Sequence, residues 1–314
     1  MKKIPVWIDC DTGIDDSLAL LVANRMEALE IVGISTVSGN VHLSKTTPNT
    51  IKICDLMGAD YPVYPGADKP VLRPYQDAGE FHGADGLGGA ELPKPSREAE
   101  KVPMWDALYE AAKKYEGELC VVTIGPMTNF AIALSKYPEL VKLLKLHAFM
   151  GGATKGGNCS PCAEYNIYAD PEAAQIVCRS GIKMVMCPLD VTHQAILTEE
   201  FLDELASHDT PVTRFVRSSS ERGLRRNLAA GLGGIAQHDV CPVLYLAHPE
   251  LFEGEEAGVY VETQGELTLG KTVTDLYSDK QFDRHNATVL LKVDHPRFEK
   301  IVRDALLSYG RKAD

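Results

Sequence analysis

The first sixteen residues constrain the fold of this chain more than any other stretch. Residues 4–8, Ile-Pro-Val-Trp-Ile, are almost wholly apolar. Such a run is typical of a strand buried on both faces of a parallel sheet, although a buried helical turn would look similar. From Ser17 onward, apolar residues recur at helical spacing. The stretch therefore predicts a strand, a tight turn at Gly13 and a helix.

This turn also carries an unusual density of negative charge, with carboxylates at Asp9, Asp11, Asp15 and Asp16. Ligand crevices in parallel sheets lie beyond the carboxyl ends of the strands. Two carboxylates about 6 Å apart repel each other by roughly 2 to 3 kcal/mol at an effective dielectric near 20, so we expect a cation among them. Oxygen donors favour calcium or magnesium over zinc. The alternative is that Asp15 or Asp16 only caps the helix.

Length and charge narrow the class of protein. The 314 residues, of which 45% are hydrophobic, suffice for one large α/β domain or two small ones. No run of about 18 apolar residues is present, and the initial Met-Lys-Lys leads directly into the first strand without a signal-peptide core. We therefore expect a soluble, cytoplasmic protein. The net charge of −12 argues against nucleic acid or a membrane as a partner.

The cysteines give little evidence for a metal or redox centre. Eight are scattered singly along the chain, except that Cys159 and Cys162 are separated only by Ser-Pro. One such pair without a second is weak evidence for zinc, and a redox pair is expected at the start of a thioredoxin-like helix. We interpret the two as reduced thiols in a loop, with a metal site or a disulfide as the alternatives.

The remaining chain alternates apolar runs with helical segments. The predicted strands cover residues 30–37, 62–66, 119–124, 146–150, 182–188, 258–263 and 287–293. The predicted helices cover residues 43–57, 105–115, 130–135, 198–206, 211–224, 242–247 and 297–309. A long Gly- and Pro-rich stretch at 67–102 is of the kind that is usually functional or disordered in compact domains. The pattern contains no internal repeat or linker.

The turn at residues 9–16 resembles the Asp-x-Asp-x-Gly-x-Asp-Asp signature of the inosine-uridine preferring nucleoside hydrolase family. Further family landmarks follow in order: His-Gly-x-x-Gly at 82–86, Gly-x-x-Thr-Asn at 125–129, Ala-Glu-Tyr-Asn at 163–166 and His-Asp at 238–239. The resemblance covers almost the whole chain and implies one α/β domain over residues 1–314, with a mostly parallel, Rossmann-like central sheet flanked by helices. It also implies calcium-dependent hydrolysis of ribonucleosides to free base and ribose, in nucleotide salvage.

The resemblance assigns the metal to groups from opposite ends of the chain. It implies that Asp16, Asp239 and the main-chain carbonyl of Ile124 bind Ca²⁺. Asp11 would also touch the ion and act as the base that activates a water held there, because calcium polarises water less than zinc does. Asp9 would support the turn without touching the ion.

His238 is the expected proton donor to the departing base, because imidazole titrates near neutral pH. The alternative for the His-Asp pair is purely structural, with Asp239 capping the following helix and His238 a buried bystander.

The family landmarks also supply candidate contacts to the ribonucleoside. These are Asp15, Asn40, His82, Asn158, Glu164 and Asn166. Amides and carboxylates suit ribose hydroxyls because they both donate and accept hydrogen bonds, whereas His82 would face the base. The alternatives are that Asn40 serves only the turn and that His82 is a surface residue.

Base preference and assembly follow less directly from the sequence. Some family members have tyrosines in the interval at 225–231, which here is Arg-Arg-Asn-Leu-Ala-Ala-Gly. We expect pyrimidine or mixed ribonucleosides as substrates and assign no role to Arg225 or Arg226. The polar run at 218–226 is more typical of a solvated helix face than of a binding patch. By analogy with other enzymes we expect a homodimer or homotetramer.

Two other functions compete with this interpretation. Asp9-Cys10-Asp11-Thr12 partly matches the first motif of haloacid-dehalogenase-like magnesium phosphatases, in which Asp9 would attack phosphorus. That family also needs a Gly-Asp pair, and the sequence contains no Gly-Asp dipeptide. A catalytically silent nucleoside or ribose binder is the second alternative, and the presence of both Asp11 and His238 argues against it.

Overall fold

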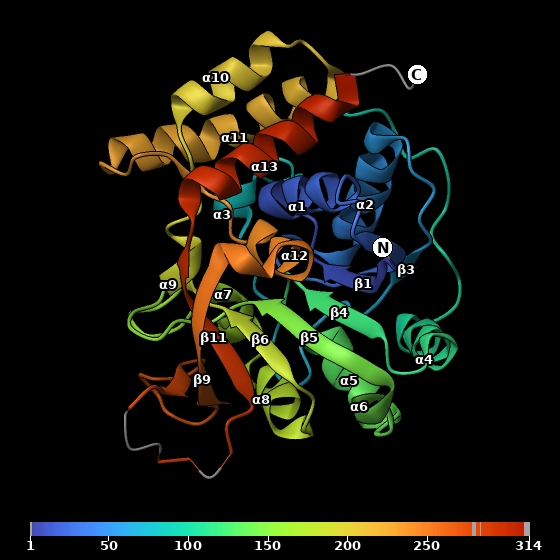
Figure 1. Cartoon of the computed structure of the whole chain (residues 1–314), viewed down its shortest axis with the longest axis vertical. Helices are drawn as coiled ribbons and strands as arrows, with labels where there is room; N and C mark the ends of the chain where they lie inside the picture. The colour runs from blue at the N-terminus through green and yellow to red at the C-terminus, as the bar shows by residue number, and fades with distance from the viewer. Residues whose placement is uncertain (1, 278–280, 283, 311–314) are drawn as a thin grey trace.

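A mixed sheet with a long parallel section organises the chain (Figure 1). The computed structural model describes residues 2–277, 281–282 and 284–310. Within these residues the strand order is β10-β9-β11-β6-β5-β4-β1-β2-β3. All neighbours from β11 to β3 pair in parallel, whereas β9 pairs antiparallel with both β10 and β11. The prediction of a mostly parallel central sheet is confirmed.

The strands of this sheet are β1 (Ile4–Cys10), β2 (Leu29–Thr36), β3 (Val63–Pro65), β4 (Leu119–Thr123), β5 (Leu144–Met150), β6 (Met184–Cys187), β9 (Phe252–Val261), β10 (Thr272–Asp275) and β11 (Ala287–Val293). A separate antiparallel pair consists of β7 (Ile196–Leu197) and β8 (Ile235–Ala236). The sequence did not predict this pair, because two-residue strands are too short to show a period.

Helices cover both faces of the sheet (Figure 1). One face carries α1 (Ile14–Ala23), α2 (Leu43–Met57), α10 (Glu199–Ser207), α11 (Pro211–Ala229), α12 (Val240–Ala247) and α13 (His295–Leu307). The other face carries α4 (Met104–Tyr115), α5 (Thr128–Lys136) and α8 (Pro171–Ser180). The alternation of β1 serves both layers, since Val6 and Ile8 join the first core and Trp7 joins the second.

Short elements also form where the sequence predicts no helix. These are α3 (Gly79–His82), α6 (Leu140–Leu143), α7 (Tyr165–Ala169), α9 (Leu189–Thr192) and the 3-10 turn at Pro249–Leu251. A second 3-10 turn, Ser308–Gly310, takes the place of the last residues of the helix predicted over 297–309. Among the described residues, no helix combines the length and apolar character that crossing a membrane requires.

Two helix boundaries differ from the predicted ones in ways that concern the site. Helix α1 begins at Ile14 and not at Ser17, so that Asp15 and Asp16 belong to its first turn, where acidic groups are favoured by the helix dipole. Helix α11 continues to Ala229, past the predicted end at residue 224. The extra turn consists mainly of good helix formers, which hydrophobic periodicity alone does not detect.

Candidate active site

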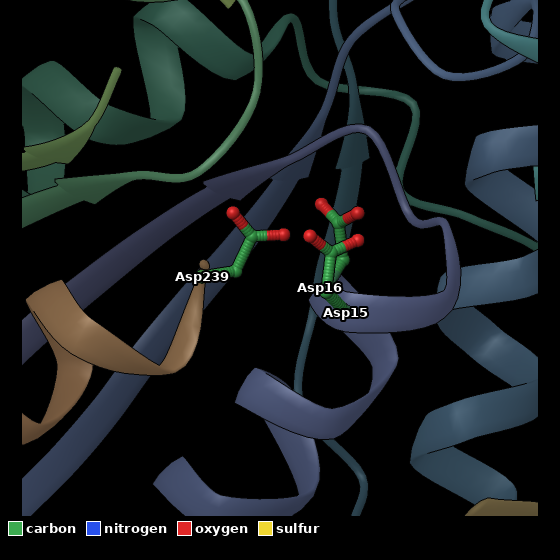
Figure 2. Close-up of side chains that lie close together, drawn as sticks. All are labelled: Asp15, Asp16 and Asp239. Atoms are coloured by element: carbon green, nitrogen blue, oxygen red, sulfur yellow. The ribbon is translucent and has the colours of Figure 1, made fainter. Parts of the chain in front are cut away.

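Three carboxylates from distant parts of the chain meet beyond the carboxyl ends of the parallel strands. One oxygen from each of Asp15, Asp16 and Asp239 lies within 4.8 Å of the other two. Figure 2 shows Asp15 and Asp16 side by side at the start of α1, with Asp239 reaching toward them from α12. The structure therefore brings the N-terminal acids and the late His-Asp pair together.

Asp16 combines two roles. Its Oδ1 accepts a 3.0 Å hydrogen bond from the amide of Asp11, and its Oδ2 accepts one of 2.8 Å from the amide of Gly13. The side-chain amide of Asn40 donates a third hydrogen bond, of 3.0 Å, to Oδ2. Asp16 thus closes the turn, as the capping alternative expected, and still faces the carboxylate group.

Asp239 does not behave as a helix cap. It occupies the N-cap position of α12, but its side chain makes no capping hydrogen bond there. The side chain is buried and is directed toward Asp15 and Asp16 (Figure 2). The structural alternative for Asp239 is therefore wrong.

Asp11 lies in a narrow slot between two glycines. It is completely buried, and its Oδ2 accepts a 2.6 Å hydrogen bond from the amide of Asn40, whereas its Oδ1 has no hydrogen-bond partner among the described residues. A Cβ on Gly39 would lie 2.0 Å from Oδ2, and one on Gly125 would lie 2.7 Å from Oδ1. Asp11 is not one of the three acids within 4.8 Å of one another, but its charge acts on both Asp16 and Asp239.

Burial and mutual repulsion make the ionised forms of these acids unfavourable unless a cation is bound. Burial, followed by the charge of Asp15, raises the pKa of Asp16 to about 7. Burial also raises the pKa values of Asp11 and Asp239 well above the usual range, and neighbouring acids add to both shifts. Among the described residues, no lysine or arginine pairs with any of these acids. An oxygen-only donor set with an unpaired buried Asp11 Oδ1 fits a hard divalent cation.

The carbonyl of Ile124 also lies at this edge of the sheet, directly after β4. It accepts a 3.1 Å hydrogen bond from Nδ2 of Asn166. A carbonyl oxygen has two lone pairs, so this bond leaves one for a further partner. Ile124 and Asn166 line the same cavity as Asp15 and Asp239.

Asp9 lies near the end of β1 and is held by hydrogen bonds from β2 and α5. Its Oδ1 accepts hydrogen bonds from Oγ of Ser35 and from Nδ2 of Asn129, the latter at 2.7 Å. Burial raises the pKa of Asp9 to about 7. Asn129 also donates to the carbonyl of Thr36, so one side chain joins α5 to β1 and β2. The Gly-x-x-Thr-Asn motif at 125–129 contains Asn129 but does not by itself indicate this contact.

A cavity of about 970 Å³ opens above the carboxylates. Its lining includes nine of the eleven predicted site residues, namely Asp15, Asn40, His82, Ile124, Asn158, Glu164, Asn166, His238 and Asp239. Asp11 and Asp16, the other two, lie buried behind this wall. The volume is in the range of small-molecule sites.

The segment at 158–166 forms one wall of the cavity through its own hydrogen bonds. Glu164 caps α7 by accepting from the amides of Asn166 at 2.9 Å and Ile167 at 3.3 Å, and it also accepts a 2.9 Å hydrogen bond from the amide of Gly152. Burial raises the pKa of Glu164 to about 7 in spite of these bonds. Oδ1 of Asn158 accepts a 2.9 Å hydrogen bond from the amide of Tyr165. These contacts fix the polar side chains along the wall.

The hydroxyl of Thr192, a residue to which the sequence assigns no role, holds the ring of His238. Its Nδ1 lies 2.8 Å from Oγ1 of Thr192 in α9, and its ring contacts the ring of His193 edge-on. The pKa of His238 is lowered to about 4, chiefly by burial; the charge of Asp15 opposes this shift, and the nearby histidines add to it. Forty-six positions separate Thr192 from His238, so no sequence spacing could have indicated the pair.

His82 lies on the cavity wall and not on the surface. Its Nδ1 accepts a 3.3 Å hydrogen bond from the amide of Ile14 and lies 4.0 Å from Oδ1 of Asp15. Its side chain is only 15% exposed, so the surface alternative is wrong. Burial lowers its pKa below the usual value.

Two arginines of α11 also line the cavity. Arg222 and Arg226, part of the run predicted to be a solvated face, lie on its wall together with Phe81.

Cys159 and Cys162 are both free thiols, as interpreted from the sequence. The thiol of Cys162 donates a hydrogen bond to the carbonyl of Leu267.

The parallel sheet and the acid-lined cavity define an α/β enzyme with a candidate divalent-cation site at the carboxyl ends of its strands. Residues 6–300 match the model of the inosine-uridine preferring nucleoside hydrolases. The chain belongs to this family, and it is therefore an N-ribosyl hydrolase that acts on nucleosides.

Known relatives are similar over nearly their full lengths. The chain is 37% identical to the pyrimidine-specific ribonucleoside hydrolase RihA of a Shewanella species, covering 97% of this chain and 96% of the relative. It is also 37% identical to the non-specific ribonucleoside hydrolase RihC of Escherichia coli, covering 97% and 98%. The solved structure of a purine-preferring ribonucleoside hydrolase from Gardnerella vaginalis superposes with a TM-score of 0.93 at 31% identity, covering 98% of this chain and 100% of that chain.

Proposed function

We propose that this enzyme hydrolyses the N-glycosidic bond of ribonucleosides with Ca²⁺ as its cofactor, Asp11 as general base and His238 as the donor to the leaving base. The observation that carries the proposal is the meeting of Asp15, Asp16 and Asp239 within 4.8 Å at the cavity. The family depends on a metal, and no lysine or arginine pairs with the acidic group among the described residues, where the one histidine within ion-pairing distance of it is His82, 4.0 Å from Asp15.

The groups that would hold the ion are Asp11, Asp16, Asp239 and the carbonyl of Ile124. A calcium ion bound there would increase the acidity of a water and order the ribose hydroxyls. Oxygen donors alone favour calcium or magnesium over zinc. Asp15, the third member of the group, is the carboxylate that we assign to a ribose hydroxyl.

Asp11 is suited to take up a proton. Its Oδ1, like Oδ2 of Asp9 and Oδ1 of Asp15, is a buried oxygen without a hydrogen-bond partner among the described residues, and its other oxygen is fixed by the amide of Asn40. A nearby positive charge favours the ionised form of a carboxylate. Asp11 would therefore be ionised, and able to act as a base, only when the acidic group is neutralised.

The polar wall would hold the sugar. Asn40, Asn158, Glu164 and Asn166 line the cavity beside the acidic group. Their amide and carboxylate groups would position the ribose so that its anomeric carbon faces Asp11. Cleavage passes through an oxocarbenium-like sugar, so contacts that strengthen as positive charge develops accelerate the reaction.

His238 would act on the base. Its lowered pKa favours a neutral ring in the resting enzyme and makes the protonated ring a stronger acid than an ordinary imidazolium. The hydrogen bond with Thr192 fixes the ring, so that its other nitrogen can face the cavity. General acid assistance of this kind contributes about 10²- to 10⁴-fold. His82, at the same wall, would contact the base without transferring a proton.

The preferred base is expected to be a pyrimidine, or both base classes. The two curated relatives described above are named pyrimidine-specific and non-specific, and the similar solved structure is named purine-preferring. Overall likeness therefore does not select the base, and side chains around the cavity rim must do so.

The test is a reducing-sugar assay with a panel of purine and pyrimidine ribonucleosides, before and after treatment with a chelator. Ribose release that disappears with the chelator and returns with added Ca²⁺ is the expected result. Binding of ribonucleosides without ribose release would instead identify a silent binder. Phosphate release from p-nitrophenyl phosphate without ribose release would identify a phosphatase.

Location and assembly stay predictions. We expect a cytoplasmic enzyme of nucleotide salvage that forms a homodimer or homotetramer. Cell fractionation and light scattering of the purified protein measure these two properties directly.

A further inference from the structure

The arginines in the second half of α11 divide between two environments. Arg217 and Arg225 pair with carboxylates on the outer side of the helix, including Glu221 with both. Arg222 and Arg226 are four positions apart, which places them on one helix face, and they line the cavity. Neither of these two guanidinium groups has a carboxylate within 4 Å among the described residues. The cavity therefore has two unpaired cations at its edge.

Arg226 has a defined position in spite of its exposure. Its guanidinium carbon lies 4.0 Å from the centroid of the Phe81 ring. Phe81 is 51% exposed, although it lines the cavity and directly precedes His82. Stacking on an aromatic ring orients a guanidinium and leaves its N–H groups free at the edges. Phe81 thus presents the donors of Arg226 at the rim of the cavity.

The buried acids and Arg226 lie at different depths of the cavity, whose lining also includes the exposed Asp77 and Glu80. Asp11, Asp16 and Asp239 are buried at the floor, whereas Phe81 and Arg226 are exposed at the rim. If ribose lies against the acidic group, the base must extend toward the rim. The bond electrons move onto the base when the glycosidic bond breaks, and in an oxo base that charge spreads to the carbonyl oxygens. A cation at the rim would stabilise this charge.

We propose that Arg226, held by Phe81, binds the far carbonyl of the leaving base and stabilises the negative charge that develops there. This inference rests on the proposed function. It predicts a preference for bases with an oxo group at the far edge, such as uracil and hypoxanthine. Cytosine and adenine carry an amino group at that position, which donates hydrogen bonds and cannot accept one from a guanidinium.

The experiment compares Arg226→Gln with wild type on uridine, cytidine and p-nitrophenyl riboside, whose leaving group needs no stabilisation. A charge-assisted hydrogen bond corresponds to about tenfold in rate. We therefore expect kcat/KM for uridine to fall about tenfold, mainly through kcat because the charge is largest in the transition state. Cytidine and p-nitrophenyl riboside should change less than twofold, and Arg226→Lys should recover part of the uridine rate.

Arg225→Gln is the matched control, because Arg225 is bound to Glu199 and Glu221. It should leave all three rates within twofold of wild type. An equal loss on the three substrates in Arg226→Gln, or no loss on any of them, overturns the inference. The wild-type protein is assayed first. If it releases ribose from none of the three substrates, the proposed function itself is refuted.

Discussion

The backbone amide of Asn40 donates a 2.6 Å hydrogen bond to Oδ2 of Asp11. Asp11 follows β1 and Asn40 follows β2, and these strands pair in parallel, so their carboxyl ends lie at the same edge of the sheet. The side chain of Asn40 also donates to Asp16. Asn40 therefore fixes two of the acids in the N-terminal turn.

Replacement of Asp11 by Asn should separate catalysis from folding. Asn keeps the shape and an acceptor for the amide of Asn40, but it cannot act as a base. We expect a loss in kcat of about 10²- to 10⁴-fold, the usual contribution of general base catalysis. Burial raises the pKa of Asp11, which costs stability above the usual carboxylate pKa, so Asn should also raise the melting temperature of the cation-free protein at neutral pH. Steady-state kinetics and calorimetry measure the two effects, and unchanged turnover would exclude Asp11 as the base.

Gly39→Ala should damage the site by displacing Asp11. The added Cβ would lie 2.0 Å from Oδ2 of Asp11 and 2.8 Å from Cδ of Pro126, so the carboxylate must move. We expect a large loss of activity and a destabilisation of about 1 to 3 kcal/mol from overpacking. Gly156→Ala is the control, because the nearest atom to its Cβ would be 3.8 Å away. Similar activities of the two variants would contradict the slot around Asp11.

Stabilisation by Ca²⁺ should depend strongly on pH. The pKa of Asp16 is raised from 3.8 to about 7, so without a cation its contribution to stability is lost as pH rises from about 4 to about 7. A divalent cation binds the ionised form and offsets this loss. The increase in melting temperature caused by Ca²⁺ should therefore be small at pH 5 and large at pH 8.

The same measurement on Asp239→Asn provides the control for this effect. Removal of one member of the acidic group should abolish most of the Ca²⁺-dependent increase at pH 8. The buried His147, whose pKa is lowered to about 3, also makes stability depend on pH. Its effect cancels when the melting temperatures with and without Ca²⁺ are compared for the same protein at the same pH. A shift of equal size at both pH values would contradict cation binding at these acids.

His238→Ala should slow poor leaving groups selectively. If His238 assists departure of the base, inosine hydrolysis should fall by about 10²-fold or more, while p-nitrophenyl riboside should change little. Thr192→Val removes the hydroxyl that fixes the ring, and we expect a smaller loss with the same selectivity. Rates on both substrates come from one steady-state assay, and equal losses would count against His238 as the donor.

The family signature and the strand-turn-helix start led correctly to a mostly parallel sheet and to nine of the residues that line the cavity. Local patterns could do this because Asp11 and Ile124 directly follow strands, Asn40 lies in the turn after β2, and parallel strands end at a common edge. Partners contributed by other segments could not be found in this way. Thr192 meets His238, Asn129 meets Asp9, and Phe81 meets Arg226 only after helices and loops have packed.

The sequence alone determined that acids are concentrated where a buried strand turns into a helix, because that pattern is local and each residue is read from its neighbours. Only the tertiary structure decided that Asp239 joins those acids, that Asp11 lies between two glycines, and that Arg226 stands at the rim. The physical reason is that charge repulsion, burial and stacking depend on distances between segments, and those distances are set by the packing of the sheet and its helices.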